Sequence, residues 1–405
     1  MKSAIGYWKP GKVIPAELPD GPGAWLRAHN PITATEKIIL YDTFDRRFRQ
    51  HGLLLTREDD GCYYCRKLRT LRALASHDSA GTRPPQRESL TDQEFARQFN
   101  PVAGNRAALR QDVIKRKHHI YTLNAEHGAP HCQVEVDTLQ AVGPRKSSVV
   151  LVRLHSLSKH TLPLHRAATA LQQQGFIPFF SYDEPLASLL RTAGHDPERH
   201  NLRINISAEQ PAIEAVIKLL QENFRRMRRN EHGIVKDIDI EFLHDFRVIL
   251  RQTRTMLSEF AALLPSPGVR RFKTELGKLG RQTNRLRDCD VMLEYRDKYL
   301  QMLPPELRPG LETFFRRIAV QRGKELASVR ALLTSSAYHT LGQDWLNFLA
   351  DAMIGEHETP QATIQTCAAR RICRNFKKIL KSIRNGNDAD DRALHQVRIR
   401  CKKLR

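Results

Sequence analysis

The sequence has few cysteines, no long hydrophobic run and no apolar leader. Its 405 residues include seven cysteines, an odd and modest number that favours reduced thiols over a disulfide framework. No stretch approaches the roughly eighteen apolar residues that a membrane-spanning helix needs. The first residues lack the apolar core of a signal peptide. These absences predict a cytoplasmic protein.

Common catalytic and cofactor motifs are also missing. There is no GxxxxGKS/T, GxSxG or GxGxxG segment, so nothing supports an NTPase, a serine hydrolase or a dinucleotide-binding protein. Cys62 and Cys65 form a CxxC pair with His77 nearby, but zinc needs two more ligands at a suitable spacing. The remaining clustered histidines are interpreted as loop residues: His118, His119, His127 and His131. We predict no catalytic residue, no metal site and no cofactor.

Basic residues, by contrast, are abundant. The chain has 66 Lys and Arg against 44 Asp and Glu, which gives a formal net charge of +22. Such a charge repels itself, and a polyanionic partner is the simplest reason to keep it. Nucleic acid, a membrane surface and inorganic polyphosphate all remain open at this point.

The chain divides into two parts that differ in net charge and in secondary-structure pattern. Residues 1–209 carry a net charge of +8 and are interrupted by Pro, Gly and short strand-like runs. These runs are residues 37–41, 62–68, 133–136 and 148–154. Residues 210–405 carry +14 and show long stretches at helical period. The sequence predicts an α+β protein: a mixed domain over 1–209, a linker near 208–211 and an all-helical domain over 210–405.

The helical part contains an internal repeat. Residues 222–227 read ENFRRM, and residues 374–379 read RNFKKI. About twenty residues after each segment comes a second match, LHDFRVILRQTR from Leu243 and LHQVRIRCKKLR from Leu394. This pattern predicts two helical units of one plan, at about 210–300 and 360–405.

Each second segment carries a stripe of cations on one helix face. The first stripe is His244, Arg247, Arg251 and Arg254, and the second is His395, Arg398, Lys402 and Arg405. Their spacing places each set within one arc of a helix, where like charges are destabilising without an anion. The apolar seam of the first helix lies about 120° away from the stripe, so the stripe flanks the core. The seam residues are Phe246, Leu250, Thr253, Leu257, Phe260 and Leu264. A solvated helix face is the alternative, but two copies that both begin with His favour a groove between the two helices.

Further cations accompany the stripes. The next predicted helix carries a third set, and the segments before the stripes carry more. These positions are Lys278, Arg281 and Arg285, then Arg225 and Arg229 with their counterparts Lys377 and Lys381. Asp288 and Asp290 follow the third set, and we interpret them as carboxylates that hold neighbouring arginines rather than a metal.

The segments HDFRVILRQTR, LGRQTNRLRDCDV and LHQVRIRCKKLR together resemble the CHAD domain, a helical module named for its histidines. The resemblance covers about residues 210–405. It implies two repeated four-helix units around a basic pore or groove, with inorganic polyphosphate as the ligand. In the family the second motif helix is followed by further helices, whereas this sequence stops at Arg405, so the second unit is expected to be truncated.

The first part resembles a CYTH domain, which often precedes CHAD modules. The resemblance rests on LYDTFDRRF and GLLLTR within residues 40–57, and the compatible region covers about 30–205. It implies an antiparallel β-barrel or sheet that hydrolyses triphosphates with acidic residues and a divalent metal.

The acidic pattern of that family is largely missing here. Residues 1–40 lack its alternating glutamates, and residues 149–154 read VVLVRL. Glu135 and Asp137 are the only remaining pair at a suitable spacing, and we interpret them as a surface pair. We therefore expect a degenerate CYTH-like domain without hydrolase activity. Arg57, Arg66 and Arg69 are candidates for phosphate binding inside it.

The function predicted from the sequence is the binding of inorganic polyphosphate in a basic groove, with association to polyphosphate granules in the cell. Nucleic-acid binding is the first alternative, although the stripes contain no aromatic residue for base stacking. The second alternative is a metal-dependent triphosphatase in the N-terminal domain, which would depend on Glu135 and Asp137.

Overall fold

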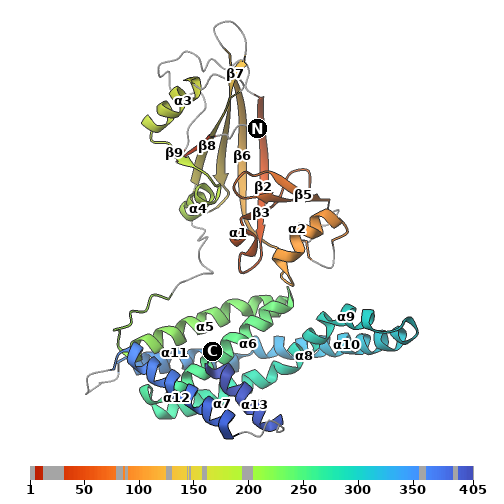
Figure 1. Cartoon of the computed structure of the whole chain (residues 1–405), viewed down its shortest axis with the longest axis vertical. Helices are drawn as coiled ribbons and strands as arrows, with labels where there is room; N and C mark the ends of the chain where they lie inside the picture. The colour runs from red at the N-terminus through yellow and green to blue at the C-terminus, as the bar shows by residue number, and fades with distance from the viewer. Residues whose placement is uncertain are drawn as a thin grey trace. The chain divides into compact units, whose positions relative to one another are not determined.

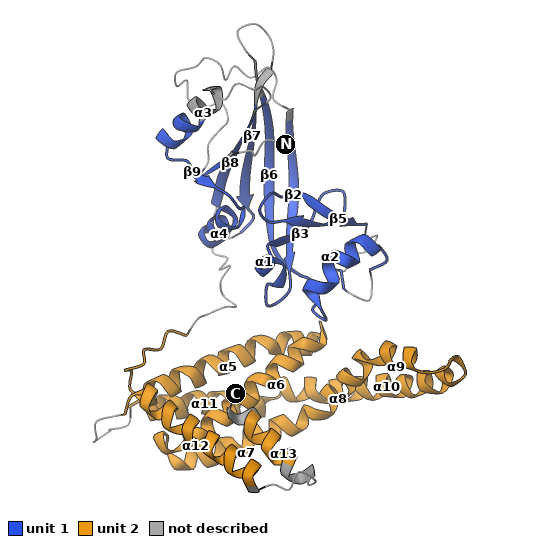
Figure 2. Cartoon of the chain, in the orientation of Figure 1, with its two compact units in different colours: residues 1–202 blue, residues 203–405 orange. Residues whose placement is uncertain are grey.

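The computed structural model divides the chain into two compact units, Met1–Leu202 and Arg203–Arg405 (Figure 2). The structure describes residues 5–11, 32–78, 85–86, 90–124, 130–143, 145, 147–156, 162–193, 204–354, 362–385 and 391–404. Within these residues, no helix is both long enough and apolar enough to cross a bilayer.

The first unit is built on a nine-stranded antiparallel sheet in the order β5-β4-β3-β2-β6-β7-β8-β1-β9 (Figure 1). The strands are β1 Ile5–Pro10, β2 Ile32–Asp42, β3 Leu53–Arg57, β4 Tyr63–Lys67, β5 Ala73–His77, β6 Leu109–Asn124, β7 Pro130–Ala141, β8 Ser147–Ser156 and β9 Ile177–Phe179. The helices are α1 Arg47–Gln50, α2 Gln93–Ala103, α3 Leu162–Gln173 and α4 Asp183–Thr192. The described pairings leave β5 and β9 as edges, so they form an open sheet.

The interior strand β8 is buried on both faces of the sheet. Val149 and Leu151 belong to one apolar cluster, and Val150 and Val152 belong to the cluster on the opposite face. Helix α4 contributes leucines to the first cluster, and α3 contributes Leu171 to the second. A strand that is buried on both faces needs a near-continuous apolar run rather than alternation. Residues 149–154, which read VVLVRL, form such a run.

The four strand-like runs of the sequence are confirmed as parts of β2, β4, β7 and β8. The interpretation of the clustered histidines as loop residues is wrong for three of them, because His118 and His119 lie inside β6 and His131 lies in β7. Strand β6 pairs with β2 on one side and β7 on the other, so backbone hydrogen bonds hold the polar segment in the sheet. His127 lies outside the described residues.

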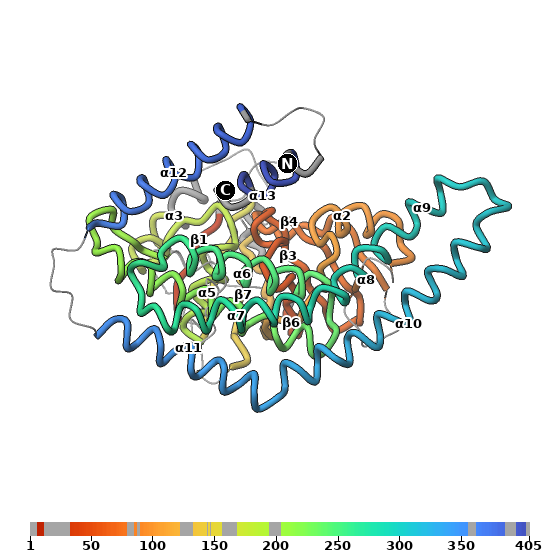
Figure 3. The backbone as a smooth tube through the Cα atoms, turned by 90° about the horizontal axis from the view of Figure 1, so that it is seen from below, coloured from red at the N-terminus to blue at the C-terminus, as the bar shows by residue number. Residues whose placement is uncertain are grey.

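The second unit consists of helices (Figures 1 and 3). They are α5 Ala212–Lys236, α6 Ile240–Glu259, α7 Ser266–Gln282, α8 Asn284–Glu294, α9 Arg296–Met302, α10 Arg308–Leu333, α11 Ser336–Ile354, α12 Ile364–Asn385 and α13 Asp391–Leu404, with short 3₁₀ turns at Ala261–Leu263 and Pro305–Leu307. Both halves of the sequence repeat are helical pairs: α5 packs on α6, and α12 packs on α13. Helices α8 and α9 and the start of α10 form an arm that extends from the rest of the unit.

Helix α6 carries the first cation stripe, and its position is fixed by its apolar seam. The Asp239 side chain caps the helix by accepting hydrogen bonds from the backbone N–H groups of Glu241 and Phe242. The predicted seam residues Phe246, Leu250, Thr253 and Leu257 are all buried. The seam was also predicted to continue through Phe260 and Leu264, but the helix ends at Glu259 and a 3₁₀ turn follows.

The prediction that Asp288 and Asp290 hold neighbouring arginines needs correction. Asp290 is buried and pairs with Arg322 of α10, far along the chain, at 2.7 Å. The same guanidinium donates two hydrogen bonds to Asp237, at 2.6 and 2.9 Å. Asp288 is exposed. One arginine therefore joins the end of α5 to α8 and α10, and Asp290 is a structural partner within that contact.

Candidate anion-binding site

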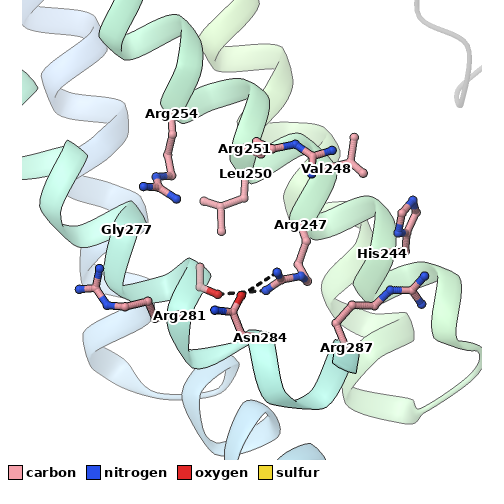
Figure 4. A pocket seen from close by; sticks show the side chains of 11 residues that line it. His244, Arg247, Val248, Leu250, Arg251, Arg254, Gly277, Arg281, Asn284 and Arg287 are labelled. Carbon is pink, nitrogen blue, oxygen red and sulfur yellow. Dashed lines mark hydrogen bonds between the residues drawn. The ribbon is translucent and has the colours of Figure 1, made fainter. Parts of the chain in front are cut away.

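The first cation stripe lines a cavity between α6 and the α7–α8 segment, of about 320 Å³ (Figure 4). We call it the α6–α8 cavity. Its lining includes one histidine, five arginines and no acidic residue. The lining residues are His244, Arg247, Val248, Leu250, Arg251, Arg254, Gly277, Gly280, Arg281, Asn284 and Arg287. The cations come from three helices and are arranged around one space.

Arg247 ties the walls of this cavity together. Its Nη1 donates to the Gly280 carbonyl at 3.0 Å and to Thr283 Oγ1 at 2.7 Å, while Nη2 donates to Asn284 Oδ1 at 2.7 Å. Burial lowers the pKa of this guanidinium from its usual value, and Arg251 and Arg287 lower it further, while Asp288 opposes them. Arg247 therefore holds α6 against the α7–α8 junction and adds positive charge to the cavity wall.

The other four arginines are available for a ligand. In the described part of the chain, Arg251, Arg254, Arg281 and Arg287 form no ion pair with a carboxylate. The Nη1 atom of Arg287 is buried and has no hydrogen-bond partner among the described residues. A buried charged donor without an acceptor is costly. The cavity therefore has the properties of an anion site.

Two glycines of α7 lie next to the guanidinium groups of this cavity. A Cβ atom at Gly277 would lie 3.7 Å from a guanidinium nitrogen of Arg254 and 3.7 Å from one of Arg281. A Cβ atom at Gly280 would lie 3.5 Å from the other Arg254 nitrogen. The Arg254 head thus lies over bare backbone of α7, beside Arg281.

A second and larger cavity adjoins the first. It measures about 940 Å³, is lined by residues of α5, α6, α7, α12 and α13, and shares Val248, Arg251 and Arg254 with the α6–α8 cavity. We call it the α6–α12 cavity. It adds the cations Arg226, Lys273 and Arg371. Its one acidic residue, Glu259, accepts a hydrogen bond from Asn375 at 3.2 Å. The two cavities share two arginines of α6, and we call the two together the cationic path.

The structure brings together five of the predicted site residues, and the other described ones lie elsewhere. His244, Arg247, Arg251, Arg254 and Arg281 line the α6–α8 cavity. Lys278 pairs with Glu275, Arg285 lies 3.7 Å from Glu325 with its side chain 80% exposed, and Arg225 pairs with Glu222. The remaining described positions line neither cavity: Arg229, Lys377, Lys381, His395 and Arg398.

The second stripe therefore contributes less to this path than the first. His395 and Arg398 are exposed on α13, and only Ile399 of that helix lines the α6–α12 cavity. The side chain of Lys402 and the whole of Arg405 lie outside the described residues. The second copy of the repeat instead contributes Arg371 and Asn375 of α12 to the lining of the α6–α12 cavity.

Several lining residues could not be predicted from the sequence, because helical spacing does not reveal the break between α7 and α8. Helix α7 ends at Gln282 and α8 begins at Asn284, so the third stripe does not continue along one helix. The change of direction moves Arg285 away and brings Arg287 into the cavity. Of the cations on α5, Arg226 lines the α6–α12 cavity, and the phase of the buried residues on α5 is the signal that distinguishes it from Arg225 and Arg229.

The two candidate carboxylates of the first unit, Glu135 and Asp137, lie in ion pairs. Asp137 is 1% exposed, so its interpretation as part of a surface pair is wrong. It lies 2.7 Å from both Arg116 and His118 and 3.3 Å from Arg153. Glu135 pairs with Arg153 at 2.6 Å and with His155 at 3.3 Å. The strand alternation places both carboxylates on the face of β7 that also carries Leu139.

The divalent metal that the CYTH resemblance implies does not fit these residues. Arginine and histidine side chains already occupy the oxygens of Glu135 and Asp137. Across the described ranges, no three His, Cys, Asp or Glu side chains converge to hold a metal, and the CxxC pair is included in that result. We derive no metal-dependent step.

The three candidate phosphate ligands of this unit are dispersed. Arg66 lines a cavity of about 220 Å³ together with Arg72, Arg116 and Arg153, but it is paired with Glu58. Arg57 donates to the Gly61 carbonyl at 3.1 Å and lies over the Tyr63 ring. Arg69 is exposed and does not line this cavity.

Comparison with known families decides the nature of the second unit. The family model of the CHAD domain matches residues 218–405. These residues form a CHAD domain. The match includes the α6–α8 cavity and both copies of the repeat. The expectation of a helical CHAD domain after an antiparallel sheet is thus confirmed.

Solved structures similar to this chain share low sequence identity with it. A CHAD domain from the plant Ricinus communis is 22% identical with a TM-score of 0.43, and the match covers 50% of this chain and 65% of that one. PptA from Streptomyces chartreusis is 15% identical with a TM-score of 0.37, over 48% and 73% of the two chains. A Hippeastrum protein described as having a dominant triphosphatase activity is 12% identical with a TM-score of 0.30, over 48% and 97%. No curated protein matches the chain.

Proposed function

We propose that the CHAD domain of this protein binds inorganic polyphosphate along the path formed by the α6–α8 and α6–α12 cavities. The observation that carries the proposal is the set of five arginines from three helices around one cavity that no acidic residue lines. Four of them have no carboxylate partner among the described residues. A linear chain of phosphates supplies repeated anionic oxygens, which guanidinium groups bind in a bidentate manner.

The composition of the path favours a ligand without bases. The α6–α8 cavity has no aromatic lining residue, and the α6–α12 cavity has only Phe260. Proteins that hold single-stranded nucleic acid usually stack bases on several aromatic side chains. Nucleic acid therefore remains the weaker alternative. A metal-dependent triphosphatase reaction in the first unit is disfavoured, because Glu135 and Asp137 already lie in ion pairs.

The test is a binding titration of long-chain polyphosphate with a paired set of variants. Arg251→Ala with Arg287→Ala removes two cavity arginines. The matched control, Lys278→Ala with Arg285→Ala, removes the same charge from the same unit outside both cavities. We expect the cavity variant to lose at least about tenfold in affinity, since each charged hydrogen bond contributes roughly 1.5–3 kcal/mol. The control should change little.

Two results would contradict the proposal. The first is equal loss of affinity in both double variants, which would indicate general attraction to the basic surface. The second is displacement of polyphosphate by RNA or DNA at equal phosphate concentration. The logarithm of the binding constant should also fall linearly with the logarithm of salt concentration, because bound phosphates release counterions. Association with polyphosphate granules follows as the cellular expectation of this proposal.

A further inference from the structure

The cavity of about 220 Å³ in the first unit combines apolar walls with arginines, and we call it the Tyr182 cavity. Seven of its fifteen lining residues are isoleucine or leucine. All seven belong to the apolar cluster around β8 and α4 or pack against it. Apolar walls with a few polar groups are typical of small-molecule sites. The volume lies below the range of about 300–1,000 Å³ that drug-sized ligands occupy, so a ligand of this cavity must be small.

Tyr182 is held at this cavity by its backbone and by its ring. The backbone N–H donates to the Leu68 carbonyl at 3.2 Å, and the ring makes an edge contact with Phe179 at 5.1 Å between ring centres. The residue is 2% exposed. Its hydroxyl has no hydrogen-bond partner among the described residues, although buried hydroxyl groups normally have one. An acceptor on a ligand in the cavity satisfies this donor.

Arg153 brings a second unused donor to the same cavity. Its guanidinium carbon lies 5.8 Å from the centre of the Tyr182 ring. One terminal nitrogen, Nη2, pairs with Glu135 and Asp137. The Nε atom is buried and has no partner in the part of the chain that the structure describes. A carboxylate can accept hydrogen bonds from two donors at once, so it suits this pair of groups.

The charges at the Tyr182 cavity favour a ligand with a single negative charge. Three of the four lining arginines are paired with carboxylates, in the contacts Arg66–Glu58, Arg116–Asp137 and Arg153–Glu135. Glu36 adds a further carboxylate 3.5 Å from Arg116. Only Arg72, among these described arginines, forms no ion pair. One uncompensated cation suits one carboxylate, whereas the several charges of a triphosphate would be buried without partners.

We propose that the Tyr182 cavity binds a small monocarboxylic acid with an apolar body, without a metal ion. The carboxylate accepts hydrogen bonds from the Tyr182 hydroxyl and from Arg153 Nε, and Arg72 supplies the opposite charge. The apolar body packs against the isoleucines and leucines of the walls. This ligand differs from the triphosphate that the CYTH resemblance implies, because the ion-paired carboxylates of this unit do not fit that family's metal. The proposal does not depend on polyphosphate binding by the second unit.

The experiment titrates the full chain with sodium hexanoate in a calorimeter, without added metal. We expect saturable binding of one hexanoate per chain. Affinity should rise by about threefold for each methylene between acetate and hexanoate, because each one is buried against the apolar walls. Hexanamide has the same body but no charge, and it should bind at least about tenfold more weakly. Equal affinity for hexanamide and hexanoate would overturn the proposal.

Two variants test the assigned residues. Tyr182→Phe should lower hexanoate affinity by about tenfold, because a hydrogen bond to a charged group is lost. Tyr64→Phe is the matched control, since that hydroxyl pairs with Asp60 and Tyr64 does not line the cavity. Arg72→Gln should also weaken binding, whereas Arg69→Gln, at a position outside the cavity, should not.

Folding provides a separate readout for the tyrosine. Because the Tyr182 hydroxyl has no partner among the described residues, Tyr182→Phe should leave the urea midpoint of the unligated chain unchanged or raise it. Unchanged hexanoate affinity in either cavity variant would show that the ligand binds elsewhere and would overturn the proposal. Displacement of hexanoate by tripolyphosphate with Mg²⁺ would overturn it in favour of a retained triphosphate site. Arg251→Ala with Arg287→Ala should leave hexanoate affinity intact, which separates this proposal from the polyphosphate proposal.

Discussion

At the scale of single residues, the five arginines of the α6–α8 cavity have different roles. Arg247 donates hydrogen bonds to Gly280, Thr283 and Asn284. By contrast, a buried guanidinium nitrogen of Arg287 has no partner among the described residues. The spacing of the first stripe predicted that four cations share a helix face. The spacing could not predict which of the four cations forms hydrogen bonds within the folded unit, because that depends on where α8 begins.

We expect Arg247→Lys to destabilise the second unit. Lysine keeps the charge but cannot reach three acceptors on two helices at once, so the carbonyl of Gly280 and the side chains of Thr283 and Asn284 lose a partner. The free energy of unfolding should fall by about 1–3 kcal/mol. Urea unfolding would measure it, with Arg251→Lys as the control. An equal effect of both changes would mean that Arg247 has no special structural role.

A second residue-scale prediction concerns acid stability. Burial alone would raise the pKa of Asp137, but the hydrogen bond from His118 and the charges of Arg116 and Arg153 lower it below its usual value. The native state therefore binds this proton less readily than the unfolded chain. The resulting stabilisation of the first unit is present above the unfolded pKa, about 4, and is lost as pH falls through the lower native value.

Asp137→Asn should remove this part of the acid dependence and also leave Arg116 and Arg153 short of a counter-charge. Breaking such a buried pair costs roughly 3–5 kcal/mol. Urea unfolding at pH 7 and at pH 3 would show a large loss for the variant at pH 7 and a smaller one at pH 3. A loss independent of pH would contradict the assigned ion pairs.

At the scale of helices and strands, the sequence was informative where periodicity is local. The helical repeat, the seam of α6 and the four strand-like runs could all be predicted from side-chain spacing. The break between α7 and α8 could not. Thr283 at this break is buried, and its hydroxyl donates to the carbonyls of Leu279 and Gly280 while it accepts from Arg247. The break therefore combines local hydrogen bonds with a contact to Arg247 of α6, and no local pattern records that contact.

The α5–α6 contact gives an element-scale prediction. A Cβ atom at Gly233 would lie 2.2 Å from ring carbons of Phe242, so Gly233→Ala should force the two helices apart. Overpacking of this kind costs about 1–3 kcal/mol. Gly323→Ala is the control, since nothing lies within 4 Å of a Cβ atom there. Alanine at that position should raise the unfolding free energy by about 0.5–1 kcal/mol, because it favours the helix more than glycine does. Thermal melts of the two variants should move in opposite directions.

At the scale of the whole molecule, the chain has two separate cores. The apolar clusters around β8 and α4 belong to the first unit, and the seam of α6 with its neighbours belongs to the second. We expect two calorimetric transitions. Asp137→Asn should lower only one of them, and Gly233→Ala only the other. A single transition shifted by both changes would show that the units unfold together.

The cavity arginines also occupy a short span of the chain. From His244 to Arg287, 44 consecutive residues supply every side chain of the α6–α8 cavity. Contacts that are close in sequence form with a small loss of chain entropy. One copy of the helical plan is thus enough to build the α6–α8 cavity. The second copy contributes α12 to the adjoining α6–α12 cavity, so the α6–α8 cavity can form before the second half of the helical unit has been synthesised.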